Sequence, residues 1–112
     1  MDKQFRNDFN STIKWRRVDQ RSATSDLVHE DPGIQLKCLY DVERKVVRDE
    51  EGEERVSEGT LYFDGADLDP YYDSVSTEDV IEFVNGTLAQ ILRIKPYWKT
   101  EEHLEMVEVN LS

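Results

Sequence analysis

Residues 78–111 read EDVIEFVNGTLAQILRIKPYWKTEEHLEMVEVNL, three apolar-rich runs separated by Asn85-Gly86 and by residues 96–102. Asn-Gly between two β-capable runs strongly favours a hairpin with a type I′ turn, in which both central residues take a positive φ. This turn would pair Phe83 with Leu88 and Ile81 with Gln90. The stretch therefore predicts a compact β-meander at the end of the chain.

The last run, residues 104–111, predicts a strand with an irregularity. Val107, Val109 and Leu111 fall on one face, whereas Leu104 and Met106 have the opposite parity. Because side chains alternate between faces in a regular strand, we expect a bulge or packing on both sides here.

In two earlier stretches, apolar and polar residues also alternate along the chain. Residues 11–18 predict a first strand with Ile13 and Trp15 on its apolar face, and a polar connection ends at Pro32-Gly33. Residues 33–42 then predict a good strand, with apolar residues at every second position: Ile34, Leu36, Cys38 and Tyr40.

The acidic stretch DEEGEE, residues 49–54, is predicted to be the tip of a mobile hairpin whose return strand runs toward Leu61 and Phe63. A helix over residues 41–55 is the alternative, because charged residues at helical spacing abound there.

These elements predict a mostly β fold. We expect a small closed β-barrel of about five to six antiparallel strands, with a long acidic hairpin loop and at most one short helix, since closure removes exposed sheet edges. The predicted organisation is an N-terminal arm with the first strand and connection at 1–31, and a β-barrel core at 32–112 with an inserted loop at 41–59.

Composition limits the function. The 112 residues fit one domain, and 25 acidic against 14 basic residues give a formal net charge of -11. Such a surface disfavours stable nucleic-acid binding, but it suits a basic partner, a nucleic-acid mimic, or a surface past which DNA slides. No signal peptide or membrane span is expected, and the Asn-x-Ser/Thr sequences at Asn10, Asn85 and Asn110 are read as chance matches.

Neither a metal site nor catalysis is expected. The segment DGADLDPYYD places four aspartates close together, but it lacks the central glycine and the final glutamate of an EF-hand, so a solvated loop is favoured over calcium. Cys38 stands alone and at an inward position, and His29 and His103 have no neighbouring catalytic motif. The four aspartates are Asp64, Asp67, Asp69 and Asp73. We therefore expect no enzyme activity, no cofactor and no metal.

Most of the aromatic residues are expected to pack in the core or at its rim. Tyr97-Trp98 is the exception, because it follows Pro96 in the connection before the last strand, where exposed aromatic residues serve as interface anchors.

The ending of the chain resembles the small minor capsid, or head-completion, proteins of tailed bacteriophages. The match is a pattern of strands and turns over residues 32–111, without a catalytic signature. GTLYFDG, residues 59–65, is similar to the middle strand of that family, and the polar hairpin before it resembles the family's inserted loop. This chain departs from the pattern in its charged first forty residues, its acidic tip and its Pro-aromatic connection. The matching positions are Asp79, Ile81, Phe83, Gly86, Ile91, Ile94, His103, Val107, Val109 and Leu111.

The resemblance implies a head–tail connector or stopper in the virion neck, assembled in the host cytoplasm as a homo-oligomeric ring of about a dozen copies or a hexamer. Such a ring lies between a portal or adaptor protein and a tail terminator or tail tube protein, and double-stranded DNA passes its lumen without specific binding. The loop 45–57 is expected to face that channel, through Arg48, Glu50, Glu51, Glu53, Glu54 and Arg55. The residues expected at interfaces are Phe5, Phe9, Trp15, Tyr97 and Trp98.

Two other functions remain open from the sequence. The charge of -11 also suits an acidic soluble interaction module, such as a DNA mimic that inhibits a host nucleic-acid-binding protein. A small enzyme or calcium-dependent module would need the Asp64–Asp73 segment to bind a metal ion.

Overall fold

The computed structural model describes residues 9–21 and 27–112. Ten strands and one short helical segment make up this part of the chain. The strands are β1 (Ser11–Arg16), β2 (Val18–Arg21), β3 (Leu27–His29), β4 (Ile34–Asp41), β5 (Lys45–Arg48), β6 (Glu54–Ser57), β7 (Gly59–Asp64), β8 (Val80–Phe83), β9 (Leu88–Thr100) and β10 (His103–Leu111). Between β7 and β8, helix α2 (Gly65–Leu68) continues into a 3-10 helix, η1 (Asp69–Ser74).

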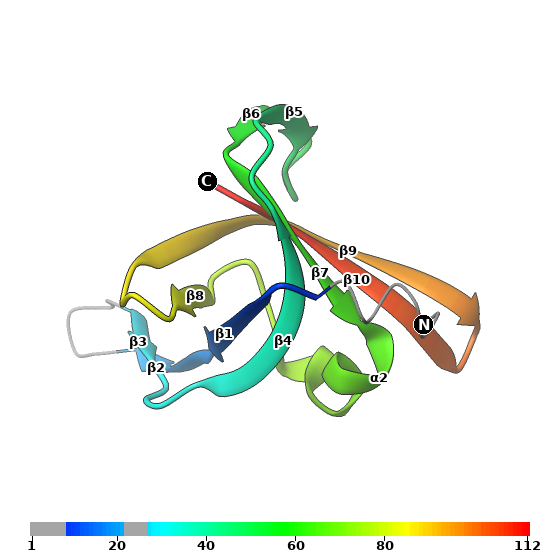
Figure 1. The fold of residues 1–112 in the computed structure, drawn as a ribbon, viewed down its shortest axis with the longest axis horizontal. Helices are drawn as coiled ribbons and strands as arrows, with labels where there is room; N and C mark the ends of the chain where they lie inside the picture. Colours follow the sequence, from blue (N-terminus) through cyan, green and yellow to red (C-terminus); the bar gives the residue numbers. More distant parts are fainter. Residues whose placement is uncertain (1–8, 22–26) are drawn as a thin grey trace.

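Six strands close into an antiparallel barrel in the order β1-β4-β7-β10-β9-β8 (Figure 1). The predicted fold, a small closed barrel with at most one short helix, is confirmed. Two further pairs form small sheets outside the barrel, β2 with β3 and β5 with β6. The connection before β4 was expected to be only polar loop, so the β2–β3 pair was not predicted.

The barrel core is built from inward side chains of all six barrel strands and from Leu68 of α2. Trp15 is among its largest completely buried side chains, and its ring centroid lies 5.5 Å from that of Phe63. The prediction that Trp15 lies at an interface is therefore wrong, because a side chain sealed inside the barrel has no surface to offer a neighbour. The core cluster comprises Ile13, Trp15, Leu36, Cys38, Leu61, Phe63, Leu68, Ile81, Ile91, Leu104, Val107, Val109 and Leu111.

A buried carboxylate, that of Asp79, joins the first strand to the segment that leads into β8. Its Oδ2 accepts the indole N–H of Trp15 at 2.9 Å and the backbone N–H of Ser76 at 2.7 Å. Its Oδ1 accepts the backbone N–H of Val18 at 2.9 Å, and the Ser76 hydroxyl lies 3.4 Å away. Since a buried charge without donors is costly, these bonds are what allow Asp79 to lie inside.

The β8–β9 hairpin exists, but its register differs from the prediction by one residue. The pairs are Val80 with Gln90 and Ile81 with Ala89, so the connection has three residues instead of two. The N–H of Gly86 donates to the carbonyl of Phe83, and Gly86 takes a φ of 87°. This is a turn closed by a left-handed glycine, which needs a positive φ at that one position only.

A bulge in β10 confirms the irregularity predicted for the last strand. The β9–β10 register shifts on both sides of Leu104. A second shift lies near the other end, where Ile91 pairs with Leu111 but Arg93 pairs with Asn110. As a result Ile91 and Ile94 both face the core despite their unequal parity.

The helical segment was expected to be irregular, because Pro70 was thought to break any element there. Pro70 instead lies at the start of η1, where its missing N–H costs nothing. The carboxylate of Asp64 accepts the N–H of Ala66 and caps α2. At Gly65 an added Cβ would come within 1.9 Å of the Leu104 carbonyl oxygen, so only glycine lets α2 approach β10 this closely.

Replacing Asp79 by alanine is expected to destabilise the protein by about 3 kcal/mol, because the buried donors of Trp15, Ser76 and Val18 would lose their acceptor. Urea unfolding followed by tryptophan fluorescence measures the difference. The exposed Asp73→Ala is the matched control, and an Asp79→Ala variant as stable as this control would show that the buried bonds do not hold the fold.

Gly86→Ala is expected to cost about 1 kcal/mol, because an L-residue must then adopt a left-handed backbone conformation. No atom lies within 4 Å of the added Cβ, so steric contact adds nothing. Gly86→Asn should cost less, since asparagine tolerates positive φ. Thermal unfolding of the three proteins gives the ranking, and equal loss in both variants would contradict a purely conformational origin.

Candidate functional site

The β5–β6 hairpin, residues 45–57, stands away from the barrel and is called the finger (Figure 1). Lys45 pairs with Ser57 and Val46 with Val56 in an antiparallel ladder. The predicted hairpin is thus confirmed, and the helical alternative for residues 41–55 is wrong. Its tip repeats the β8–β9 connection: the N–H of Gly52 donates to the Asp49 carbonyl, and Gly52 has a φ of 82°.

The carboxylate of Asp49 organises the fingertip. One oxygen accepts the backbone N–H groups of Glu51 and Glu53, at 2.9 and 3.0 Å. The other lies 3.2 Å from Nε of Arg55. Burial of this carboxylate works in the opposite direction, but the two N–H groups and Arg55 keep the pKa of Asp49 below its ordinary value.

The residues predicted to face a channel all lie on the finger, yet they differ in their contacts. Arg55 pairs with Asp49, and Arg48 lies 3.7 Å from Glu54 while donating to the Gly52 carbonyl. These two arginines offset part of the acidic charge. Glu51 and Glu53 remain at the end of the turn, both exposed.

The fingertip also holds a cluster of carboxylates. Oxygen atoms of Asp49, Glu51 and Glu53 lie within 4.8 Å of one another. The turn itself explains this cluster, because Asp49 already accepts two backbone N–H groups and Arg55. In the described ranges, the Asp64–Asp73 segment brings no three carboxylates that close, so the calcium hypothesis has no formed site.

Apolar side chains are exposed on the finger. Val46 is 65% and Val56 43% exposed, and the two lie directly opposite each other in the ladder. Val42, at the base, is also exposed. An exposed apolar cross-strand pair on an otherwise charged hairpin marks a contact surface.

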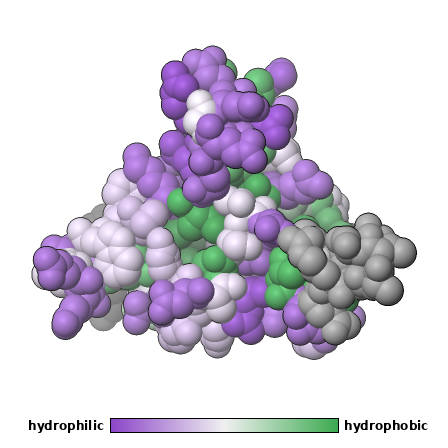
Figure 2. Space-filling model, turned by 180° about the vertical axis from the view of Figure 1, so that it is seen from behind, coloured by the Kyte–Doolittle hydropathy of each residue, from purple (hydrophilic) through white to green (hydrophobic). Residues whose placement is uncertain are grey.

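A groove of 580 Å³ lies at the fingertip and is called the finger groove. Glu50 reaches it from the finger, and its Oε1 lies 3.5 Å from the backbone N of Ile94. Figure 2 shows a mostly hydrophilic finger and hydrophobic residues exposed in a hollow beneath it. The groove is lined by Glu50, Tyr72, Val75, Ser76, Thr77 and Ile94.

Trp98 and Tyr97, the two predicted interface aromatics, lie on opposite faces of β9. Trp98 is 49% exposed and meets the ring of Tyr72 edge-on, with centroids 5.6 Å apart. Tyr97 is 36% exposed, and its hydroxyl lies 3.4 Å from Oε1 of Glu108, while Lys95 lies over its ring. The two residues therefore offer two separate surfaces.

Strand addition along β9 is restricted on the side of the finger. The N–H of Ile94 points away from β10 and toward Glu50, so alternate residues of β9 direct their backbone to this open edge. Pro96 has the same parity and lacks an N–H, which is the position proline occupies in edge strands.

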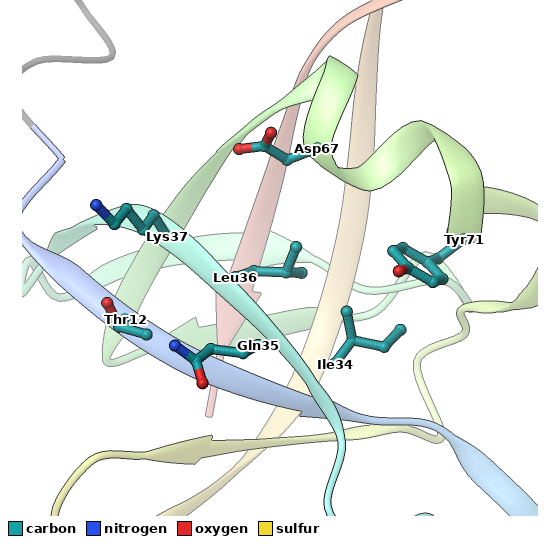
Figure 3. Close-up of a pocket in the computed structure, with 7 residues that line it drawn as sticks. All are labelled: Thr12, Ile34, Gln35, Leu36, Lys37, Asp67 and Tyr71. Carbon is teal, nitrogen blue, oxygen red and sulfur yellow. The ribbon is translucent and has the colours of Figure 1, made fainter.

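A second groove, of 370 Å³, lies between β4 and the helical segment (Figure 3). Figure 3 shows Asp67 and Tyr71 on the helical side, facing Leu36 and Lys37 of β4. Because its walls carry charges of both signs, this groove favours no ligand of one charge. Its lining residues are Thr12, Ile34, Gln35, Leu36, Lys37, Asp67 and Tyr71.

Arg17 lies in a neighbouring hollow and binds the carboxylate of Glu30 in a two-pronged ion pair. Nε of Arg17 donates to Oε1 at 2.9 Å and Nη2 donates to Oε2 at 3.0 Å. A third group, Nη1, donates to the Ser74 hydroxyl at 2.8 Å. Arg17 thereby ties the β2–β3 pair to η1, and its hydrogen bond is the main reason that the pKa of Glu30 is lowered.

The side chains with catalytic potential each have other contacts. Burial raises the pKa of the Cys38 thiol to about 12, which makes it a poor nucleophile. Nε2 of His29 lies 2.8 Å from the Glu78 carbonyl oxygen, and Nε2 of His103 lies 3.1 Å from the Glu105 carboxylate.

Two predicted interface residues belong to the arm. Phe9 is partly buried at the edge of the described chain, and Phe5 lies outside the described residues. No sequence pattern predicted the contact of Tyr72 with Trp98 or the approach of Glu50 to β9, because those contacts join segments distant in the chain.

The Arg17–Glu30 pair predicts a pH dependence. Since the folded-state pKa of Glu30 is lowered, its contribution to stability is present above the unfolded-state pKa, ordinarily about 4.3, and is lost as the pH falls through the lower folded-state value. Glu30→Gln should therefore lose less stability than the unaltered protein on acidification, by up to about 1 kcal/mol. Urea unfolding at several acidic pH values measures this. Arg17→Met should reproduce the effect, and parallel curves for all three proteins would contradict it.

A scan against protein-family models finds no match to the chain, and a search of curated proteins finds no relative. Among the described residues, no helix has both the length and the apolar character needed to cross a membrane.

Proposed function

We propose that this protein is a structural component of a tailed-phage neck: a head–tail connector or stopper without catalytic activity. It forms a homo-oligomeric ring between a portal or adaptor protein and the tail terminator or tail tube. It assembles in the host cytoplasm and remains in the virion, with the finger directed into the DNA channel.

The observation that carries this proposal is the finger, a β-hairpin that projects from a closed barrel and ends in acidic residues. Its tip turn is held by Asp49 and Gly52, so Glu51 and Glu53 are presented at a defined end instead of on a shapeless loop. Negative charge at that end repels DNA phosphates, which lets the duplex pass without being trapped.

The exposed apolar residues support assembly. Val46 and Val56 form one uncovered pair on the finger, and Trp98 offers a large aromatic surface on β9. When copies contact each other head to tail through such surfaces, they form a closed ring if the rotations between successive copies add up to one full turn.

The ion pairs of the finger favour this role over that of a DNA mimic. A mimic presents an uninterrupted array of negative groups, like the phosphates of a duplex. On the finger, Arg55 pairs with Asp49 and Arg48 with Glu54, and at its base Arg44 lies 3.6 Å from Glu58. These pairs interrupt the negative surface.

Electron microscopy of virions, combined with mass spectrometry of separated heads and tails, tests the proposal. We expect density for this barrel in a ring below the portal, with fingers pointing to the axis. Particles that contain the chain elsewhere, or not at all, would contradict it. A pull-down that captures a basic host protein by a monomer or dimer, and no virion protein, would favour the mimic instead.

A further inference from the structure

The finger groove joins apolar and aromatic surface from three parts of the fold. Ile94 of β9 lines it, and Tyr72 and Val75 come from η1 and the segment that follows it. Trp98, which has the same parity as Ile94 on β9, lies beside the groove and contacts Tyr72. Trp98 leaves about half of its surface exposed beside Tyr72. A half-open aromatic pair beside an aliphatic wall is the kind of pocket that holds one large apolar side chain.

Negative charge surrounds this pocket. Glu50 lines the groove together with Tyr72, and Asp73 follows Tyr72 directly in η1. Burial raises the pKa of Tyr72, and the carboxylates of Glu50 and Asp73 raise it further. Lys95 has the opposite parity to Trp98 and lies over the ring of Tyr97, on the other face of β9. The groove therefore favours an apolar side chain with a cation beside it.

The chain itself carries a segment of that composition. Residues 1–8, MDKQFRND, lie outside the described part of the chain. Their side-chain charges sum to zero, but the two cations, Lys3 and Arg6, lie within two residues of Phe5, whereas each aspartate lies three residues away. Eight residues can extend over about 27 Å, so this segment can reach well beyond Phe9. Phe5 and the cations next to it complement the aromatic and acidic groups of the groove.

We propose that the finger groove is the docking site for residues 1–8 of a neighbouring copy. Phe5 enters the pocket between Tyr72, Ile94 and Trp98, and its basic neighbours lie against Glu50 and Asp73. This inference rests on the ring of the proposed function and names the contact that links its subunits. It also accounts for the position of Glu50, which turns from the fingertip toward β9.

Photo-crosslinking in the full-length chain tests the docking site. Phe5 is replaced by the photoreactive p-benzoyl-phenylalanine, and ¹⁵N-labelled and unlabelled copies are mixed before irradiation. Mass spectrometry should find position 5 linked to residues 72–75 or 91–98, in products that combine labelled with unlabelled chains. Links only within one chain, links elsewhere, or no links between copies would overturn the proposal.

Two matched substitutions separate the groove from general acidity. Glu50→Gln and Glu51→Gln remove the same charge from adjacent fingertip residues, but Glu50 alone lines the groove. Glu50→Gln should lower the crosslink yield about threefold, and Trp98→Ala about tenfold, while Glu51→Gln leaves it unchanged. Equal effects of both glutamate variants would overturn the docking site.

The two proposals can fail separately. Rings found in the neck without these crosslinks would leave the neck function standing and remove the arm contact. Crosslinks between copies of a chain that is absent from virions would do the reverse.

Discussion

The barrel depends on a carboxylate placed where most proteins would put an apolar side chain. Asp79 holds the indole of Trp15 on one side and the backbone of Ser76 on the other. The donors that offset its desolvation come from β1, from the start of β2 and from the segment before β8, so the charge is tolerated only when these parts meet. The same bonds fix residues 75–77, which form one wall of the finger groove. Closure of the barrel and the shape of its candidate interface therefore share one cause.

Alternation was enough to predict the barrel, because apolar residues at every second position leave one face to bury and edges to close. Alternation was not enough to predict the register of the β8–β9 hairpin. A two-residue and a three-residue connection both suit Asn85-Gly86, and they differ in whether positive φ is needed at one position or two. Trp15 shows a related limit: an aromatic residue in an alternating strand suits either a core or an interface, and only the buried acceptor from a residue 64 positions away decides between them.

The finger was predictable for a local reason, whereas the groove beside it was not. A glycine within an acidic run, flanked by β-branched residues, is information contained in a few neighbouring positions. The approach of Glu50 to Ile94 spans 44 residues, and Tyr72 and Trp98 are 26 residues apart. No pattern along the chain encodes such contacts, since they follow from how the finger, η1 and β9 are arranged once the barrel has closed. Likewise, the four aspartates considered as calcium ligands are close in sequence, but they are spread along α2 and η1, and no three of their carboxylates lie within 4.8 Å of one another.

A net charge of -11 does not show where on the surface the negative charge is concentrated. On the finger, Arg48 and Arg55 each pair with a carboxylate, which leaves the strongest negative field at the turn itself. At physiological ionic strength, exposed charges are screened over about 8 Å, so one fingertip acts only on what comes nearly into contact with it. Several fingertips around a passage little wider than a duplex would each lie within that distance of the DNA. In the proposed ring, an acidic tip on an ordered hairpin would therefore gain its effect from assembly, and that assembly would cover Val46 and Val56, which a single copy leaves exposed.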